Sequence, residues 1–259
     1  MDYDNKMDNY IIGTGWWCDG TGKHPGSLCN KSTDYVRKKD FFKIWYYFVN
    51  KYTNPEKIII IDSNSPIKPD IKEDHRIEFV SLRKNFGHST KTLPKGILCG
   101  AERAILGGAF YSYINDADFI YIEQDCLVKG IGWVENCMRN LHKGNIMYGD
   151  GEGTPQPQQQ SLMIIKKDFI PSFIDKILSV NIRSYELTIK GANINNHSPE
   201  SNFHKALNGF VDILPFGYGR ARPINFNDKY FYAQQWTENE LNTMLKKEGI
   251  NKGSLMKIN

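Results

Sequence analysis

The chain has 259 residues with a formal net charge of +4, 40% hydrophobic residues and 24% charged residues. This length allows one large α/β domain, and the sequence has neither an 18-residue apolar run that would span a membrane nor the clustered Lys and Arg residues of a nucleic-acid-binding protein. The polar, acidic N-terminus and five Cys without C-x-x-C spacing favour a cytoplasmic protein with free thiols, although peripheral membrane contact stays open.

The first half of the chain alternates between strand-like and helix-like segments. The predicted elements are a strand at Asn9–Trp17, a helix from the caps Ser32-Thr33-Asp34 to Lys51, strands at Lys57–Asp62 and Arg76–Leu82, a helix at Gly96–Ile114 and a strand at Phe119–Glu123. The uninterrupted apolar run Lys57–Asp62 is typical of a central parallel strand that is buried on both faces. This order predicts a mostly parallel central sheet with helices on both faces.

The second half has shorter elements. The predicted elements are a helix at Gly132–Lys143, a strand at Asn145–Tyr148, a Gly/Pro/Gln-rich loop at Gly149–Gln160, a strand at Ser161–Lys166, helices at Phe169–Val180 and from Ser198, a strand at Val211–Pro215, and a last helix that opens with the capping box Thr237-Glu238-Asn239-Glu240. No repeat or linker divides the chain. We expect residues 1–259 to form one domain, with a nucleotide-binding half at about 9–127 and a smaller, mixed acceptor-binding half at about 128–259.

Two carboxylates close the Phe119–Glu123 strand. Residues two apart in an extended chain face the same side, so Glu123 and Asp125 are expected to converge on one point. Paired carboxylates repel each other unless a cation lies between them, and their hard oxygens suit Mg²⁺ or Mn²⁺. The alternative is a pair of solvated loop acids that follows an ordinary strand.

Further polar residues follow the other predicted strands. Asp62 ends the second strand, Asn85 and Gly87 follow the third, and Glu200 lies at a helix start far downstream. Parallel strands bring their carboxyl ends to one edge of a sheet, where open α/β sheets bind ligands. The segments Asp62, Asn85–Gly87 and Glu123–Asp125 are therefore expected to surround one crevice.

These residues resemble those of the nucleotide-sugar glycosyltransferases of the GT-A fold, in the broad family-2 style, over roughly residues 9–210. The similar features are Ile61-Asp62-Ser63-Asn64-Ser65, the Arg-x-Asn-x-Gly element at Arg83–Gly87, the Gly/Ala-rich helix, and Glu123-Gln124-Asp125 in place of an Asp-x-Asp metal motif. Two departures are the Glu at the first motif position and a base motif, Ser198-Pro199-Glu200-Ser201, with one acid instead of two.

The resemblance implies a role for each of these residues. Asp125 and Glu123 would hold Mn²⁺ or Mg²⁺, which neutralises a departing nucleoside diphosphate, and Asp62 would bind the base or ribose. Glu200 would accept the proton of an acceptor hydroxyl, and the reaction would invert the anomeric carbon. An acid in the first turn of a helix is also favoured by the helix dipole alone, which is the structural alternative for Glu200; Asp150 and Glu152 are the next candidates for the base.

Other segments are candidates for ligand contact. Arg220 and Arg222 suit a diphosphate because guanidinium groups are planar bidentate donors, although a surface Gly-rich turn fits Phe216–Pro223 as well. Thr14, between Gly13 and Gly15, is expected where the backbone has room near the nucleotide. The amides of Gln156–Gln160 either form a polar loop or bind sugar hydroxyls. The segment Tyr230–Trp236 is where related enzymes supply a third metal ligand, and that ligand stays open here.

The sequence therefore predicts a metal-dependent glycosyltransferase that moves a sugar from a nucleotide-sugar donor to a glycan or other hydroxyl acceptor in glycan or polysaccharide synthesis. One alternative is a sugar nucleotidyltransferase, which shares the sheet but is expected to have an Arg/Lys-bearing phosphate loop after the first strand; residues 13–22 contain no Arg. The other alternative is a protein that binds a nucleotide or carbohydrate without turnover.

Overall fold

A computed structural model describes residues 9–23, 32–71, 73–88, 92, 98–142, 145–154, 156, 158–189 and 198–251, with backbone alone for 184–189. Its main sheet has seven strands in the order β3-β2-β1-β4-β7-β6-β8. The bounds of these strands are β1 Tyr10–Trp16, β2 Lys57–Asp62, β3 Ile77–Ser81, β4 Asp118–Ile122, β6 Ile146–Asp150, β7 Gln158–Ile165 and β8 Val211–Ile213. Strands β3, β2, β1 and β4 are mutually parallel, whereas β7 runs antiparallel to both β4 and β6. The predicted α/β class with a mostly parallel sheet is confirmed.

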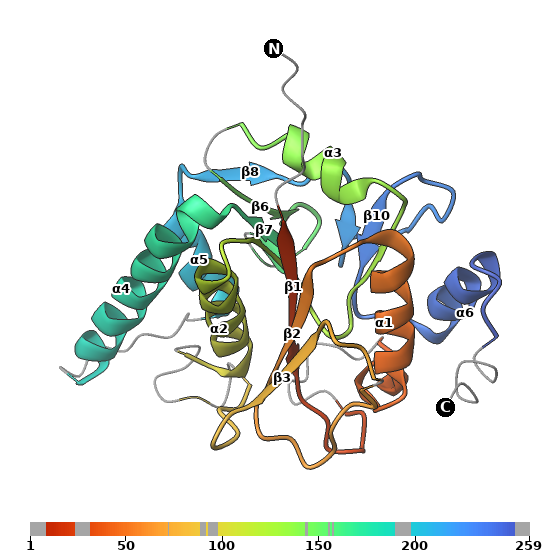
Figure 1. Ribbon diagram of the computed structural model, residues 1–259, viewed down its shortest axis with the longest axis horizontal. Helices are drawn as coiled ribbons and strands as arrows, with labels where there is room; N and C mark the ends of the chain where they lie inside the picture. Colours follow the sequence, from red (N-terminus) through yellow and green to blue (C-terminus); the bar gives the residue numbers. More distant parts are fainter. Residues whose placement is uncertain are drawn as a thin grey trace.

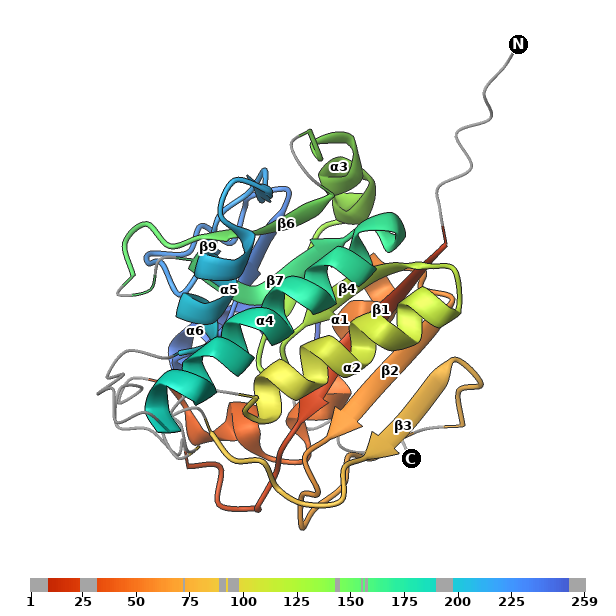
Figure 2. The same cartoon turned by 90° about the vertical axis from the view of Figure 1, so that its left-hand side faces the viewer.

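Helices cover both faces of the sheet (Figures 1 and 2). Helix α1 (Phe41–Tyr52) packs on one face, and α2 (Gly100–Ile114), α4 (Ile170–Ile189) and α5 (Pro199–Leu207) pack on the other. The four consecutive Ile residues of β2 explain this arrangement, because strand side chains alternate between faces. Ile58 and Ile60 join the core under α1, whereas Ile59 and Ile61 join the core under α2, and all four are buried.

Three glycines allow β1, β4 and α2 to pack closely together. A Cβ atom on Gly13 of β1 would lie 2.4 Å from the ring of Phe119, and one on Gly108 of α2 would lie 2.6 Å from the same ring. A Cβ on Gly15 would lie 2.9 Å from Cβ of Ala104 in α2. The backbone room that was expected for the nucleotide at Gly13 and Gly15 is therefore occupied by the packing of β4 and α2 against β1.

A second, three-stranded sheet lies beside the first. It has the order β5-β10-β9, formed by Leu127–Lys129, Phe231–Ala233 and Tyr218–Gly219. Helix α3 (Trp133–Arg139) follows β5, and α6 (Glu238–Lys247), which begins with the predicted capping box, lies outside α1 (Figure 1). Figure 2 shows that β2 and β3 end on the same edge of the main sheet, as parallel strands must.

Several element boundaries differ from the predictions. Residues Gln158–Gln160 belong to strand β7 instead of the predicted loop, and all three are buried. The segment predicted as one helix from residue 32 to 51 contains a 3-10 helix, η1 (Asp34–Arg37), followed by α1 from Phe41. Strands β5, β9 and β10 were not predicted, because two or three residues carry no recognisable alternation. His197, which precedes the cap Ser198, lies outside the described residues.

Candidate active site at the carboxyl ends of the parallel strands

The turn after β4, here called the acid turn, consists of Glu123, Gln124 and Asp125 and is bonded to the segments on both sides of it. The Gln124 side chain accepts a hydrogen bond from the backbone N–H of Trp17 at 2.7 Å and donates one to the carbonyl oxygen of Trp17 at 3.1 Å. On the other side, the N–H of Glu123 donates to the carbonyl of Ser161 in β7 at 2.8 Å. The acid turn is thus held between β1 and β7, as a continuation of the sheet.

Asp125 is buried, with 2% of its surface exposed. Its Oδ2 atom accepts two long hydrogen bonds from one guanidinium, that of Arg37, at 3.3 Å from Nη2 and 3.5 Å from Nη1. Its Oδ1 atom is buried and has no hydrogen-bond partner within the described part of the chain. A buried carboxylate oxygen without a donor is unfavourable unless a further group satisfies it.

Both negatively and positively charged side chains surround Glu123. Burial of its carboxylate among protein atoms, together with the nearby charge of Asp125, raises its pKa to about 8, while Arg220 and Arg37 act in the opposite direction. Part of the residue surface is nevertheless solvent-accessible. The repulsion between the Glu123 and Asp125 carboxylates favours either a proton or a cation between them.

Gln234 joins the acids to Arg220. In the amide orientation that satisfies both ends of its side chain, its nitrogen donates to Oε2 of Glu123 at 2.8 Å, and its oxygen accepts from Nε of Arg220 at 3.0 Å and from Oγ of Ser161 at 3.2 Å. Gln234 lies in the segment where the sequence left the third metal ligand open. Nothing in the sequence indicated that Arg37 belongs to the site, because a single cationic residue in a polar segment is common.

Glu200 lies at the start of α5, as predicted. Ser198 caps this helix by accepting from the N–H of Ser201 at 3.1 Å, and Pro199 is its first residue. Oε1 of Glu200 is 3.5 Å from Nη2 of Arg220, whose own backbone N–H donates to the Gln159 side chain. The structure therefore connects Glu200, through Arg220 and Gln234, to Glu123.

The two arginines of the Gly-rich turn have different surroundings. Arg220 lies between the predicted acids, whereas Arg222 contacts Glu240 at 2.6 Å, the carbonyl of Gln234 at 2.9 Å and the carbonyl of Gly219 at 3.0 Å. Arg222 thus supports the backbone that carries Gln234. The surface-turn interpretation, which the sequence left open, does not describe Arg220.

Asp62 is completely buried at the end of β2. Its carboxylate accepts from the N–H of Ser65 at 3.0 Å and from Oγ of Ser81 at 2.6 Å, and it also bonds the Ser65 hydroxyl and the Lys68 ammonium group. Burial raises the pKa of Asp62, but the hydrogen bonds from Lys68 and the serines outweigh it and leave the pKa lowered. Asp62 therefore holds its own turn, and its oxygens are occupied by protein donors.

The other predicted residues of the nucleotide-facing half, Asn85, Gly87 and Thr14, make their contacts within the protein. Oδ1 of Asn85 accepts from the N–H of Gly87 at 2.7 Å and from Oγ of Ser63 at 3.3 Å. Gly87 has a φ of +75°, which favours glycine, and its carbonyl accepts from the N–H of Gly100 at the start of α2 at 3.0 Å. Thr14 is buried within β1, opposite Ile60 of β2, and is not among the residues around Glu123 and Asp125.

A further buried carboxylate lies in α2, next to the helix that carries Glu200. Glu102 of α2 is fully buried, and Asn202 of α5 donates to it at 3.1 Å, while the N–H of Leu98 also donates to it. Burial is the main reason that its pKa rises to about 7. Glu102 was not identified from the sequence, where it is an ordinary helical acid; it links the loop before α2 to the helix that carries Glu200.

The acids fit a divalent cation only as part of a larger ligand set. Among the described residues, no group of three His, Cys, Asp or Glu side chains could hold a metal ion. Mg²⁺ commonly takes one or two carboxylates and completes its coordination with water and substrate phosphates. The unpartnered Oδ1 of Asp125 and the adjacent carboxylate of Glu123 fit such a site. Asp150 and Glu152, the next candidates for the base, are both exposed, and Oδ1 of Asp150 accepts from the N–H of Glu152.

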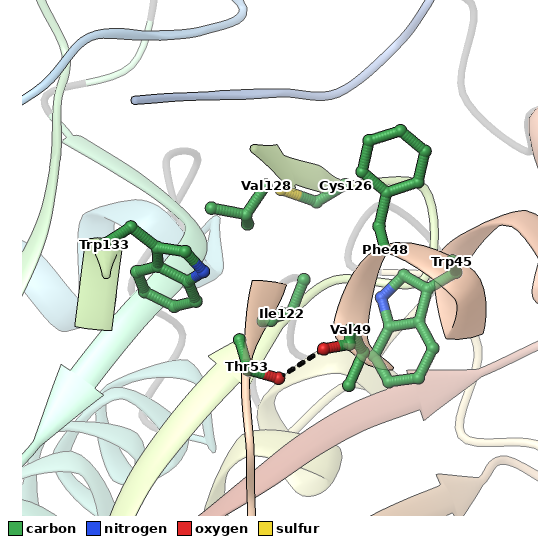
Figure 3. Close-up of a pocket in the computed structure, with 8 residues that line it drawn as sticks. All are labelled: Trp45, Phe48, Val49, Thr53, Ile122, Cys126, Val128 and Trp133. Carbon is green, nitrogen blue, oxygen red and sulfur yellow. Dashed lines mark hydrogen bonds between the residues drawn. The ribbon is translucent and has the colours of Figure 1, made fainter. Parts of the chain in front are cut away.

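An apolar cavity lies behind the acid turn (Figure 3). Its lining comes from α1, the end of β4, the start of β5 and α3, and consists of Trp45, Phe48, Val49, Thr53, Ile122, Cys126, Val128 and Trp133. The Thr53 hydroxyl is bonded to the carbonyl of Val49, and the indole N–H groups of Trp45 and Trp133 have no partner among the described residues. The lining carries no charge that would bind a nucleoside diphosphate, so the charged cluster is the candidate site.

No helix of the described chain is long and apolar enough to cross a membrane. The described cysteines, Cys18, Cys99, Cys126 and Cys137, are buried free thiols.

Comparison with known proteins identifies a fold. The apo-form glycosyltransferase GlyE of Streptococcus pneumoniae TIGR4 superposes with a TM-score of 0.54 over 96% of this chain and 62% of that chain, at 7% sequence identity. The galactosyltransferase LgtC, solved with donor and acceptor sugar analogs, gives 0.49 over 79% of this chain and 72% of that chain at 12% identity. HddC from Yersinia pseudotuberculosis gives 0.45 over 93% of this chain and all of that chain, at 12% identity.

No protein-family model and no curated protein matches the sequence. The predicted GT-A-like fold is confirmed by the likeness to the pneumococcal protein, of which this chain spans 62% of the length. The family-2 assignment stays a prediction.

Proposed function

We propose that this chain is a glycosyltransferase that moves a sugar from a nucleotide-sugar donor to a hydroxyl acceptor. The observation that carries this proposal is the charged cluster at the carboxyl ends of the parallel strands, where Glu123, Asp125 and Glu200 lie around Arg220. Open α/β sheets bind ligands at this edge. The GT-A-like fold supports the proposal. We assign the nucleotide to the half at about residues 9–127 and the acceptor to the half at about 128–259.

In this proposal, Asp125 and Glu123 hold Mn²⁺ or Mg²⁺. When bound, such a cation supplies positive charge that stabilises the departing nucleoside diphosphate. The chain supplies the rest of the electrostatics. Arg220 is held by Gln234 and Gln159 and provides a further cation beside the acids. Arg222 fixes the backbone below Gln234 through its ion pair with Glu240.

The nucleotide would lie over the turns that follow β2 and β3. Asp62 holds the turn at Ser65 and the Lys68 ammonium group, and Asn85 shapes the turn at Gly87. We assign the base and ribose to this edge. Because protein donors occupy the oxygens of Asp62, Asp62 would act on the nucleoside through the turn that it holds. Thr14 lies within β1 beneath it.

Glu200 is the proposed general base. The Ser198 cap fixes the start of α5, which carries Glu200, and Nη2 of Arg220 lies 3.5 Å from the Glu200 carboxylate. A carboxylate in hydrogen-bond reach of the acceptor hydroxyl takes its proton as the oxygen attacks. One in-line displacement of this kind gives the product with the inverted anomeric configuration.

A donor panel tests the function directly. Nucleotide-sugars that differ in base and sugar are incubated with simple hydroxyl acceptors, with and without Mn²⁺, and nucleotide release is measured. The proposal predicts release that needs Mn²⁺ and is lost in Asp125→Ala, while NMR of the product shows the inverted anomer. Release of pyrophosphate from a sugar 1-phosphate and a nucleoside triphosphate would instead identify a sugar nucleotidyltransferase, and binding without turnover would identify a binding protein.

A further inference from the structure

Arg37 contacts Asp125 in an arrangement that does not satisfy either partner. Both terminal nitrogens of the guanidinium approach the same oxygen, Oδ2, at 3.3 and 3.5 Å, and Oδ1 is left without a donor. A stable arginine–carboxylate pair uses two parallel hydrogen bonds to two oxygens, at about 2.7–2.9 Å. The observed contact is therefore weak, and a ligand that binds Asp125 more strongly would displace Arg37.

A divalent cation at Asp125 would be incompatible with this contact. Metal–oxygen distances for such ions are about 2.0–2.2 Å, so the ion would lie within a few ångströms of the guanidinium. Like charges at this separation repel strongly where solvent is largely excluded, and Asp125 is 2% exposed. Cation binding therefore requires Arg37 to leave Oδ2.

Arg37 has no second acceptor among the described residues. Oδ2 of Asp125 is the one acceptor of its guanidinium within the ranges that the structure describes. The displaced group must therefore bind water or a ligand. A diphosphate that bridges to the same cation offers several anionic oxygens at this place, and arginine binds phosphate bidentately.

The backbone below Arg37 is fixed, so only its side chain needs to move. Arg37 is the last residue of η1, whose Val36 is buried in the core. Thr33, just before η1, donates from its N–H to the carbonyl of Trp236 at 2.7 Å and from its hydroxyl to Glu238 at 2.9 Å. These contacts anchor η1 to the same segment that presents Gln234, and the Arg37 side chain, 18% exposed, remains within reach of a ligand.

We propose that Arg37 exchanges partners during donor binding: it holds Asp125 in the empty site and binds the diphosphate of the donor once a divalent cation occupies Asp125. This inference rests on the proposed function and adds to it a residue with two successive roles. Arg37 makes binding of the cation alone weaker and binding of the cation together with the diphosphate stronger, so that the two ligands enter cooperatively.

The test compares Arg37→Gln with the parent in two binding measurements. Binding of Mn²⁺ alone is followed by electron paramagnetic resonance, and binding of UDP and of GDP at saturating Mn²⁺ is followed by calorimetry. Arg37→Gln is expected to bind Mn²⁺ alone about five- to tenfold more tightly, because a positive charge is removed from its ligand. It is expected to bind the diphosphate about tenfold or more weakly, because charge-assisted hydrogen bonds are lost.

Two further variants separate charge from geometry. Arg37→Lys retains the charge but not the planar pair of donors, so it is expected to bind Mn²⁺ like the parent and the diphosphate more weakly. Lys39→Gln removes one positive charge two residues away, where Lys39 pairs with Asp70 at 2.6 Å, and is expected to change neither affinity.

The opposite signs make the outcome decisive. Damage to the fold would weaken both ligands, and it is checked by thermal unfolding of each variant. If the parent binds Mn²⁺ and a nucleoside diphosphate but Arg37→Gln weakens both or alters neither, the exchange is wrong and the proposed function stands. If the parent binds neither Mn²⁺ nor either nucleotide, the proposed function fails and the exchange fails with it.

Discussion

Replacement of Glu102 by Gln is expected to make the protein more stable at neutral pH and to remove part of the pH dependence of its stability. Glu102 is fully buried between α2 and α5, and burial raises its pKa from 4.5 to about 7. Gln has nearly the same shape, can accept from the N–H of Leu98, and can donate to the Asn202 side chain if that amide turns over. The substitution thus removes the charge and retains the packing.

The magnitude follows from the shift in pKa. Below pH 4.5, Glu102 is protonated in both the folded and the unfolded chain and contributes no pH dependence. Between pH 4.5 and about 7 the unfolded chain loses its proton while the folded chain retains it, so the free energy of unfolding falls as the pH rises. A difference of about 2.5 pKa units corresponds to about 3 kcal/mol at 1.36 kcal/mol per unit, reached above pH 7.

Urea denaturation at several pH values from 4.5 to 8 measures this effect. The difference in unfolding free energy between Glu102→Gln and the parent is the informative quantity, because the other titrating groups contribute equally to both. That difference is expected to increase in favour of the variant by about 3 kcal/mol across the range. A difference that stays constant with pH would refute the reasoning, since Glu102 would then be ionised in the folded protein at the same pH as in the unfolded chain.

Four other substitutions test the site and the core. Asp125→Ala should abolish Mn²⁺ binding measured by electron paramagnetic resonance and leave the thermal unfolding midpoint near that of the parent; retained Mn²⁺ binding would contradict the metal assignment. Glu200→Gln should keep donor affinity but lower kcat by roughly 10² to 10⁴, and near-normal turnover would leave Glu200 as a helix-start charge. Asp62→Asn should weaken free nucleotide and nucleotide-sugar by a similar factor, about tenfold, in calorimetry; a loss confined to the nucleotide-sugar would assign Asp62 to the sugar. Gly13→Ala should destabilise the fold by about 1–3 kcal/mol in urea denaturation, because its Cβ would overlap the ring of Phe119, and an unchanged midpoint would show that the ring has room to move.

Sequence reasoning located the fold and the acid turn because both depend on local pattern. The Ile58–Ile61 run allows only a strand covered on both faces, and the acids at the end of β4 follow from the next such run. Parallel topology then places strand ends together without knowledge of any side-chain contact. The GT-A-like class could therefore be predicted, although no single motif was specific.

The parts that were missed depend on tertiary contacts. Gln158–Gln160 read as a polar loop, but they form a strand because β6 pairs with them and because Gln159 bonds the carbonyl of Asp150 at 2.6 Å. Arg37 and Gln234 are distant in sequence and meet the acids only through η1 and the segment after β10. No spacing rule connects such positions, since long-range contacts and not periodicity bring them together.

Residues in and next to the last helix, α6, make contacts that complete the site late in synthesis. Trp236 and Glu238 hold the residue before η1, Glu240 pairs with Arg222, and Glu248 receives bonds from Lys51 and Tyr52 of α1. During synthesis, strands β1 to β7 and the acid turn leave the ribosome before residues 236–248 do. A nascent chain therefore contains its acids before the contacts that position Arg37 and Arg222, so the charged cluster is completed only after residues 236–248 have been made.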